Sequence, residues 1–180
     1  MCWVLNVVAT FISPDIGLIN VDNIGMRRKR KTTREILPDP KYSNVMVAKF
    51  TNYVMRRGKK ATAQQIIYRT FDVLEKKHKQ DPLTVFNAAI QNVEPQVEIK
   101  SRRIGGAAYQ VPREVRGERQ LALACRWLLD AARSKKGRPM HEKLAEELML
   151  ASKNEGSAIK KKMDTHRMAE ANKAFAHFSW

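Results

Sequence analysis

Residues 98–112, EIKSRRIGGAAYQVP, carry a double glycine between two short runs in which apolar and polar side chains alternate. Val97, Ile99 and Ser101 alternate with polar or charged residues, and Tyr109 and Val111 continue an alternating pattern after the glycines. A period of two is typical of β-strands, so the sequence predicts a β-hairpin that turns through residues 104–107. An isolated hairpin is marginally stable in water, so helices at its base or a partner at its tip must hold it.

On both sides of this hairpin the hydrophobic period is helical. The Asp-Pro pairs at 39–40 and 81–82 each predict an N-cap followed by proline at the first helical position. The last helical segment is expected to place Met163 and Met168 on its apolar face. Helices are expected at about residues 40–57, 59–78, 82–94, 117–134, 139–155 and 157–178. The predicted fold is mainly α, a six-helix bundle with one protruding two-stranded β-hairpin.

The length of 180 residues suits one domain with a single core, so one function is expected. The first 25 residues contain no Lys or Arg, whereas Met26 opens the basic run MRRKRKTTR. Neither a signal peptide nor a transit peptide has that composition. Our hypothesis is that translation starts at Met26 and that residues 1–25 are a misassigned leader. Residues 26–180 then form the domain, in which residues 26–36 are a basic arm and residues 95–116 a β-ribbon.

The charge of the chain indicates a polyanionic partner. Lys and Arg total 34 against 18 Asp and Glu, which gives a formal net charge of +16. Nucleic acid is the leading candidate, and an anionic membrane surface is the second. No apolar stretch is long enough for a membrane span, which argues against a membrane. Cys2 and Cys125 lie in unrelated settings, which favours a reducing, intracellular protein.

Several groups of residues are candidates for contacts with a polyanion. The arm is a block of like charges that repel one another until a partner neutralises them. The ribbon combines cations with glycines, which permit close approach to a phosphate chain. A third group surrounds the start of the fourth helix, and a fourth lies in the loop before the fifth. The candidates are Arg27, Arg28, Lys29, Arg30, Lys31 and Arg34 in the arm, Lys100, Arg102, Arg103, Gly105 and Gly106 in the ribbon, Arg113, Arg116 and Arg119 at the helix start, and Lys136 and Arg138 in the loop.

Each group also has a simpler interpretation. The ribbon cations could keep a solvated hairpin soluble and prevent strand pairing at its edges. Glu114 and Glu118 could pair with the arginines around the fourth helix start, and the basic loop could be a plain connector. A phosphate docked at that helix start would instead contact both the arginines and the exposed amides.

Signatures of enzymes and metal sites are absent from the sequence. The four histidines show no metal-ligand spacing with either cysteine, and no nucleophile elbow or zinc-protease pair occurs. We therefore expect no catalytic residue, no metal and no cofactor. A helical DNA-binding regulator with a β-wing is the alternative function, with a recognition helix that begins at Gly117. A nuclease ranks third, because no pair of acids is evident.

Several long motifs resemble the bacterial small-subunit ribosomal protein seven family. They are ILPDPKY at residues 36–42, VEIKSRRIGG followed by YQVPREV at residues 97–115, RWLLDAAR at residues 126–133, and HRMAEANKAFAHFSW at residues 166–180. The resemblance covers residues 26–180 in the family's order, while residues 1–25 have no counterpart in it.

The resemblance implies a helical bundle with a protruding β-ribbon. It also implies that the protein binds the 3′ major domain of small-subunit ribosomal RNA, nucleates assembly of the subunit head and touches neighbouring small-subunit proteins. The ribbon would face the exit-site transfer RNA at the subunit interface. The implied location is the cytoplasmic bacterial ribosome, with no membrane and no obligate homo-oligomer. Carried over by motif, the RNA contacts are Arg27 to Lys31, Lys59, Lys60, Lys100, Arg102, Arg103, Arg113, Arg116 and Arg119.

Overall fold

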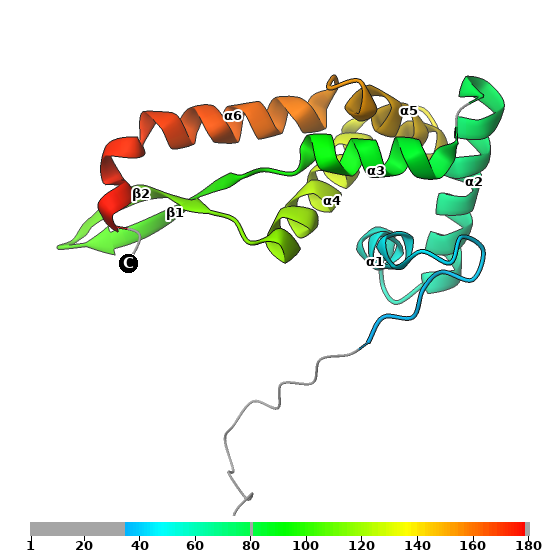
Figure 1. Ribbon diagram of the computed structural model, residues 1–180, viewed down its shortest axis with the longest axis horizontal. Helices are drawn as coiled ribbons and strands as arrows, with labels where there is room; N and C mark the ends of the chain where they lie inside the picture. The colour runs from blue at the N-terminus through cyan, green and yellow to red at the C-terminus, as the bar shows by residue number, and fades with distance from the viewer. Residues whose placement is uncertain (1–34, 80, 179–180) are drawn as a thin grey trace, which may run out of the picture. The chain divides into compact units, whose positions relative to one another are not determined.

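Helices flank a single β-hairpin in the order of the chain (Figure 1). The computed structural model describes residues 35–79 and 81–178. The elements are α1 (Val45–Val54), α2 (Lys60–His78), α3 (Pro82–Val93), β1 (Val97–Ile104), β2 (Ala107–Glu114), α4 (Gly117–Ser134), α5 (Met140–Ser152), α6 (Ser157–Ala171) and the 3-10 helix η2 (Lys173–Phe178). Within the described residues this confirms the predicted mainly-α fold with one two-stranded hairpin.

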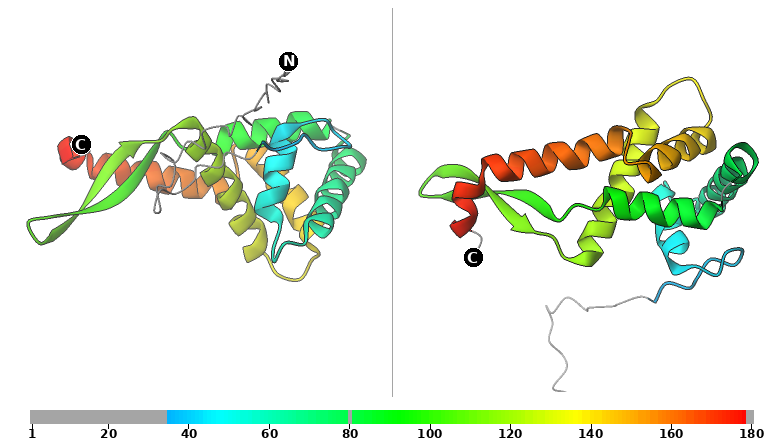
Figure 2. Two further views of the ribbon diagram at one scale, coloured as in Figure 1. Left: turned by 90° about the horizontal axis from the view of Figure 1, so that it is seen from below. Right: turned by 45° about the horizontal axis from the view of Figure 1, so that its top comes forward.

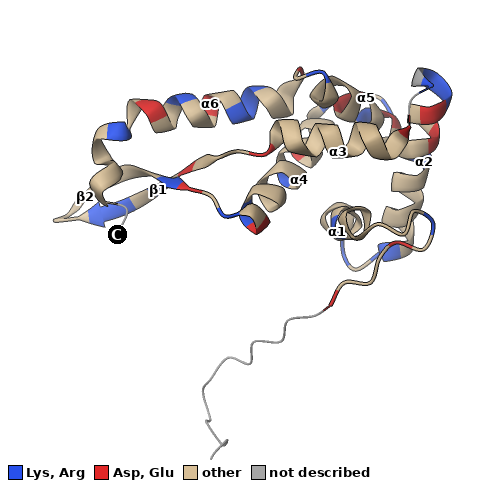
Figure 3. Ribbon diagram, in the orientation of Figure 1, with Lys and Arg blue, Asp and Glu red and all other residues tan. Residues whose placement is uncertain are grey.

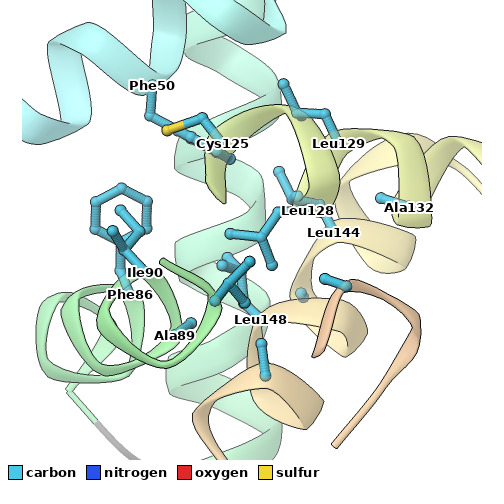
Figure 4. Close-up of a cluster of buried hydrophobic side chains, with 14 of the residues drawn as sticks. Phe50, Phe86, Ala89, Ile90, Cys125, Leu128, Leu129, Ala132, Leu144 and Leu148 are labelled. Atoms are coloured by element: carbon cyan, nitrogen blue, oxygen red, sulfur yellow. The ribbon is translucent and has the colours of Figure 1, made fainter. Parts of the chain in front are cut away.

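The core lies where α1 to α5 meet, and the start of α6 closes it (Figure 4). Aliphatic side chains such as Leu128 and Leu148 are fully buried there. Phe86 packs edge-on against two other rings, with centroids 5.3 Å from Phe50 and 5.7 Å from Phe71. Cys125 is also buried, and burial, helped by the charge of a nearby glutamate, raises the pKa of its thiol to about 12. The thiol is therefore a neutral core side chain at physiological pH.

The start of α1 differs from the prediction. Its N-cap is Asn44, whose Oδ1 accepts a hydrogen bond from the amide of Met46 at 2.7 Å. Asp39, the predicted cap, is 3% exposed and accepts hydrogen bonds from the hydroxyl of Tyr68 at 3.0 and 2.9 Å. The prediction was wrong because this carboxylate anchors the preceding turn to α2. The matching prediction for α3 is confirmed, since Asp81 accepts from the amide of Thr84 at 3.1 Å.

The hairpin turns through Gly105 and Gly106, as predicted. Their φ angles are +57° and +91°, a pair of positive values that suits the tight turns of hairpins and favours glycine. In the register of the two strands, Tyr109 lies opposite Arg102. Residues directly opposite in an antiparallel pair share a face, and successive residues alternate. Tyr109 therefore lies on the face opposite that of Ile99, so the apolar residues of the two strands do not form one surface.

Helix α6 runs beside the hairpin, and η2 packs against the hairpin near the end of the chain (Figures 1 and 2). Met163 and Met168, expected on a buried face, are 56% and 49% exposed. The expectation was wrong because α6 buries mainly small side chains, Ala158 and Ala169, together with Ile159. Beyond its first turn α6 runs beside the ribbon, and Lys162 still donates a hydrogen bond to the carbonyl oxygen of Asn92 in α3 at 2.7 Å.

A buried carboxylate fixes the start of α6. Oε1 of Glu147, a residue of α5, accepts hydrogen bonds from the amide of Ala158 and the hydroxyl of Ser157, each at 3.1 Å. Its Oε2 forms an ion pair with Nζ of Lys135 at 3.0 Å, and its side chain is 0% exposed. Gly156 has φ +99°, and a Cβ there would lie 3.0 Å from Oε1 of Glu147. These contacts tie the α4–α5 loop, α5 and α6 together.

Candidate nucleic-acid interface

The ribbon cations divide between two faces of the hairpin. Arg102 points toward the C-terminal segment, and its Nη1 donates to the carbonyl oxygen of Phe178 at 2.6 Å. Arg103, the next residue, lies on the other face and is exposed. Lys100 lies on the same face as Arg102 and is also exposed. At the tip, Gly105 and Gly106 are exposed, and no other atom lies within 4 Å of where their side chains would start. A phosphate chain can therefore approach the tip and Arg103 closely, whereas Arg102 is engaged within the protein.

Aromatic rings hold the ribbon against η2. The ring centroid of Tyr109 lies 5.3 Å from that of Phe175 and 5.6 Å from that of Phe178. Together with the hydrogen bond from Arg102, these contacts form an aromatic clamp made of Arg102, Tyr109, Phe175 and Phe178. The clamp supplies the support that an isolated hairpin needs. Sequence reasoning missed it, because no periodic pattern connects residues so far apart in the chain.

We expect replacement of Tyr109 by alanine to loosen the ribbon alone. Each ring contact contributes about 0.5–1.5 kcal/mol beyond burial, so two lost contacts correspond to about 5- to 150-fold faster local opening. Amide hydrogen exchange, followed by mass spectrometry, should speed up in β1 and β2 and stay unchanged in α3 to α5. Tyr109→Phe, which keeps the ring, should exchange like the parent protein. Equal exchange in the alanine variant would contradict the clamp.

The arginines around the start of α4 have different environments. Nη2 of Arg119 forms an ion pair with Oε2 of Glu98 on β1 at 3.1 Å. The simpler alternative named Glu114 and Glu118 as the partners of these arginines, but the carboxylate that pairs with Arg119 belongs to Glu98. Arg113 and Arg116 are exposed and form no ion pair with any residue in the described ranges. Two of the three arginines therefore face solvent without a carboxylate.

The two basic loops also differ from each other. Lys59 and Lys60, at the start of α2, are exposed and have no ion pair within the described part of the chain. In the α4–α5 loop, Arg138 approaches Glu146 at 3.7 Å, while the neighbouring Lys136 is exposed. Figure 3 shows Lys and Arg along the ribbon and at both ends of the α1–α2 loop. The predicted arm residues, Arg27 to Lys31 and Arg34, lie outside the described residues.

The structure argues against α4 as a DNA-recognition helix. Its Leu128, Leu129 and Ala132 are buried in the core. Its exposed residues include the acidic Glu118 and Asp130, which the phosphates that line a DNA groove would repel. The described residues bring together no group of three or more His, Cys, Asp or Glu that could bind a metal ion. No helix of residues 35–79 and 81–178 has the length and hydropathy needed to span a membrane.

Fold and charge together define a class, the basic and mainly helical proteins with a protruding β-ribbon. A family model described as ribosomal protein S7p/S5e matches residues 26–173. Small ribosomal subunit protein uS7 of Thermotoga neapolitana is 59% identical over 155 residues, which cover 86% of this chain and 100% of that protein. The proteins of the same name from Phenylobacterium zucineum and Anaeromyxobacter dehalogenans are each 58% identical, over 86% of this chain and 99% of their own.

The chain therefore belongs to the S7p/S5e family of ribosomal proteins. It is a structural ribosomal protein and not an enzyme. This confirms the family to which the sequence motifs pointed.

Proposed function

We propose that this protein, by family a structural constituent of the small ribosomal subunit, binds the 3′ major domain of small-subunit ribosomal RNA directly. It thereby nucleates assembly of the subunit head and lies with its ribbon toward the exit-site transfer RNA. The observation that carries this proposal is the set of exposed cations without an acidic partner in the described residues, which are Lys59, Lys60, Lys100, Arg103, Arg113, Arg116 and Lys136.

Those cations suit the recognition of folded RNA. Lys and Arg neutralise the phosphate backbone, and each neutralised phosphate releases counterions into the solvent. Folded RNA is recognised largely by its shape and its phosphates, so a rigid array of cations is well suited to it. The open backbone at Gly105 and Gly106 allows a phosphate chain close to the ribbon tip. Arg119 contributes less directly, because its guanidinium already pairs with Glu98.

The remaining assignments are part of the same proposal. Residues 26–180 are the RNA-binding domain, and the basic arm contributes Arg27 to Lys31 and Arg34. Neighbouring small-subunit proteins and exit-site transfer RNA are the proposed further partners, with no membrane and no obligate homo-oligomer. The proposed location is the cytoplasmic bacterial ribosome.

A binding titration at several salt concentrations tests this function. It compares a folded 3′ major-domain fragment with an unrelated structured RNA and a DNA duplex of equal length. Log affinity should fall by about 0.7–0.9 for each log unit of salt and each neutralised phosphate. A preference for the ribosomal fragment that persists at physiological salt supports the proposal. If the three nucleic acids bound with equal affinity and all lost affinity as salt rises, the protein would be a general binder of polyanions, which would contradict the proposal.

A further inference from the structure

A cationic hollow lies where the α1–α2 loop meets the end of α4 and the start of α5. Its volume is about 320 Å³, and its lining includes Arg56, Lys59 and Arg133 above an apolar floor of Met55, Ile66 and Met140. A volume of this size lies at the lower end of the range for small-molecule sites. No acidic residue is present in the described lining. The hollow thus combines positive charge at its rim with an apolar floor.

Two guanidinium groups face this hollow from different elements. Arg133 is half-buried in the last turn of α4, while Arg56 is exposed in the loop after α1. Burial lowers the pKa of Arg133, the charge of Arg56 lowers it further, and Asp130 opposes both effects. Neither arginine has a carboxylate within ion-pair distance among the described residues. The two positive charges repel one another, and an anion bound between them would relieve that repulsion.

We propose that the hollow binds one unpaired nucleotide of the ribosomal RNA. Its phosphate lies between Arg56 and Arg133, within reach of Lys59, and its base lies on the apolar floor. Proteins commonly recognise RNA through unpaired nucleotides, whose bases stack on aromatic or apolar side chains or on the guanidinium planes of arginines. A free inorganic anion would satisfy the charges but would leave the floor uncovered. The inference rests on the proposed RNA binding and adds residues that the sequence patterns did not indicate, Arg56 and Arg133.

Arg133→Gln is the central variant, because it removes the charge and retains a polar side chain. At about 0.15 M salt, loss of one phosphate contact corresponds to about a fivefold loss of affinity and a salt dependence reduced by about one phosphate. The melting temperature of the free protein should stay the same or rise, because the repulsion from Arg56 is removed. Lys76→Gln is the matched control, since Lys76 is exposed in α2 and outside the hollow.

A double-mutant cycle and chemical probing of the bound RNA complete the test. If one phosphate bridges both arginines, Arg56→Gln combined with Arg133→Gln should cost little more than the larger single effect. In the parent complex one unpaired nucleotide should be protected at both its sugar and its base, and Arg133→Gln should remove that protection alone. If the sugar were protected while the base stayed reactive, the base would not lie in the hollow, which would contradict the proposal.

Other outcomes separate this inference from the proposed function. If the parent protein prefers the ribosomal fragment and Arg133→Gln leaves affinity, salt dependence and footprint unchanged, the hollow is not an RNA site and the function stands. A loss of both thermal stability and affinity would make Arg133 a structural residue and would also overturn the inference. If the parent protein shows no preference for the fragment, the proposed function fails and the inference fails with it.

Discussion

Replacing Lys100, Arg103 and Arg113 together with glutamine should weaken binding to the 3′ major-domain fragment about 100-fold at about 0.15 M salt. The three side chains are exposed on the ribbon, and none has an ion-pair partner in the described residues. Each phosphate contact contributes about 0.7 log units of affinity at that salt concentration, so three lost contacts give about two log units. The salt dependence should fall by about three phosphates in the same titration. Circular dichroism should show unchanged helix content, because none of the three lies in a helix.

A variant of equal charge separates local contacts from net charge. Lys76 and Lys77 are exposed in α2, and Lys153 is exposed just after α5. Figure 1 shows α2 at the end of the helical body away from the ribbon. Changed together to glutamine, these lysines lower the net charge by the same amount and should reduce affinity only slightly. If both triple variants lost affinity equally, the ribbon would act through the overall charge of the protein and not as a contact surface.

Local patterns predicted the parts of the fold that local chemistry determines. The period of two and the glycine pair predicted the hairpin and its turn, and Asp81 with Pro82 predicted the start of α3. The start of α1 was wrong, because Asp39 bonds with Tyr68, a residue of another helix. A capping motif describes only what a side chain can do within its own turn. It carries no information about a tertiary partner that competes for the same carboxylate.

In the candidate site, too, local patterns located residues but did not predict their tertiary contacts. Composition and spacing located the cations of the ribbon and of the loops, yet their roles depend on contacts between distant residues. Arg102 and Arg103 are identical neighbours in the sequence, but strand alternation sends Arg102 to the carbonyl of Phe178 and leaves Arg103 exposed. Arg133 was missed because it ends an ordinary amphipathic run, and only packing brings α4 near Arg56. The run MRRGKK, which contains Arg56, was the available signal for the other half of the hollow.

Glu147→Ala should lower the free energy of unfolding by about 1–3 kcal/mol, because it removes a buried carboxylate that pairs with Lys135 and leaves its hydrogen-bond donors unsatisfied. It also removes the acceptor for the amide of Ala158 and the hydroxyl of Ser157 at the start of α6. Urea unfolding measures the change. Glu146→Gln is the matched control, since Glu146 also contacts Lys135, at 3.5 Å, but its side chain is 48% exposed. Surface ion pairs of that kind contribute about 1 kcal/mol or less.

A milder substitution separates the contribution of the ion pair of Glu147 from that of its hydrogen bonds at the start of α6. Glu147→Gln keeps an acceptor for Ser157 and Ala158 but removes the charge that faces Lys135, so its cost should fall between those of Glu147→Ala and Glu146→Gln. Adding Lys135→Met removes the cation that has lost its buried partner and should recover part of that loss. No recovery would mean that the ion pair contributes little and that the cap dominates. Because α6 leads to η2 and the aromatic clamp, Glu147→Gln should also speed hydrogen exchange in β1 and β2. Such a result would connect a buried carboxylate of the core to the order of the ribbon.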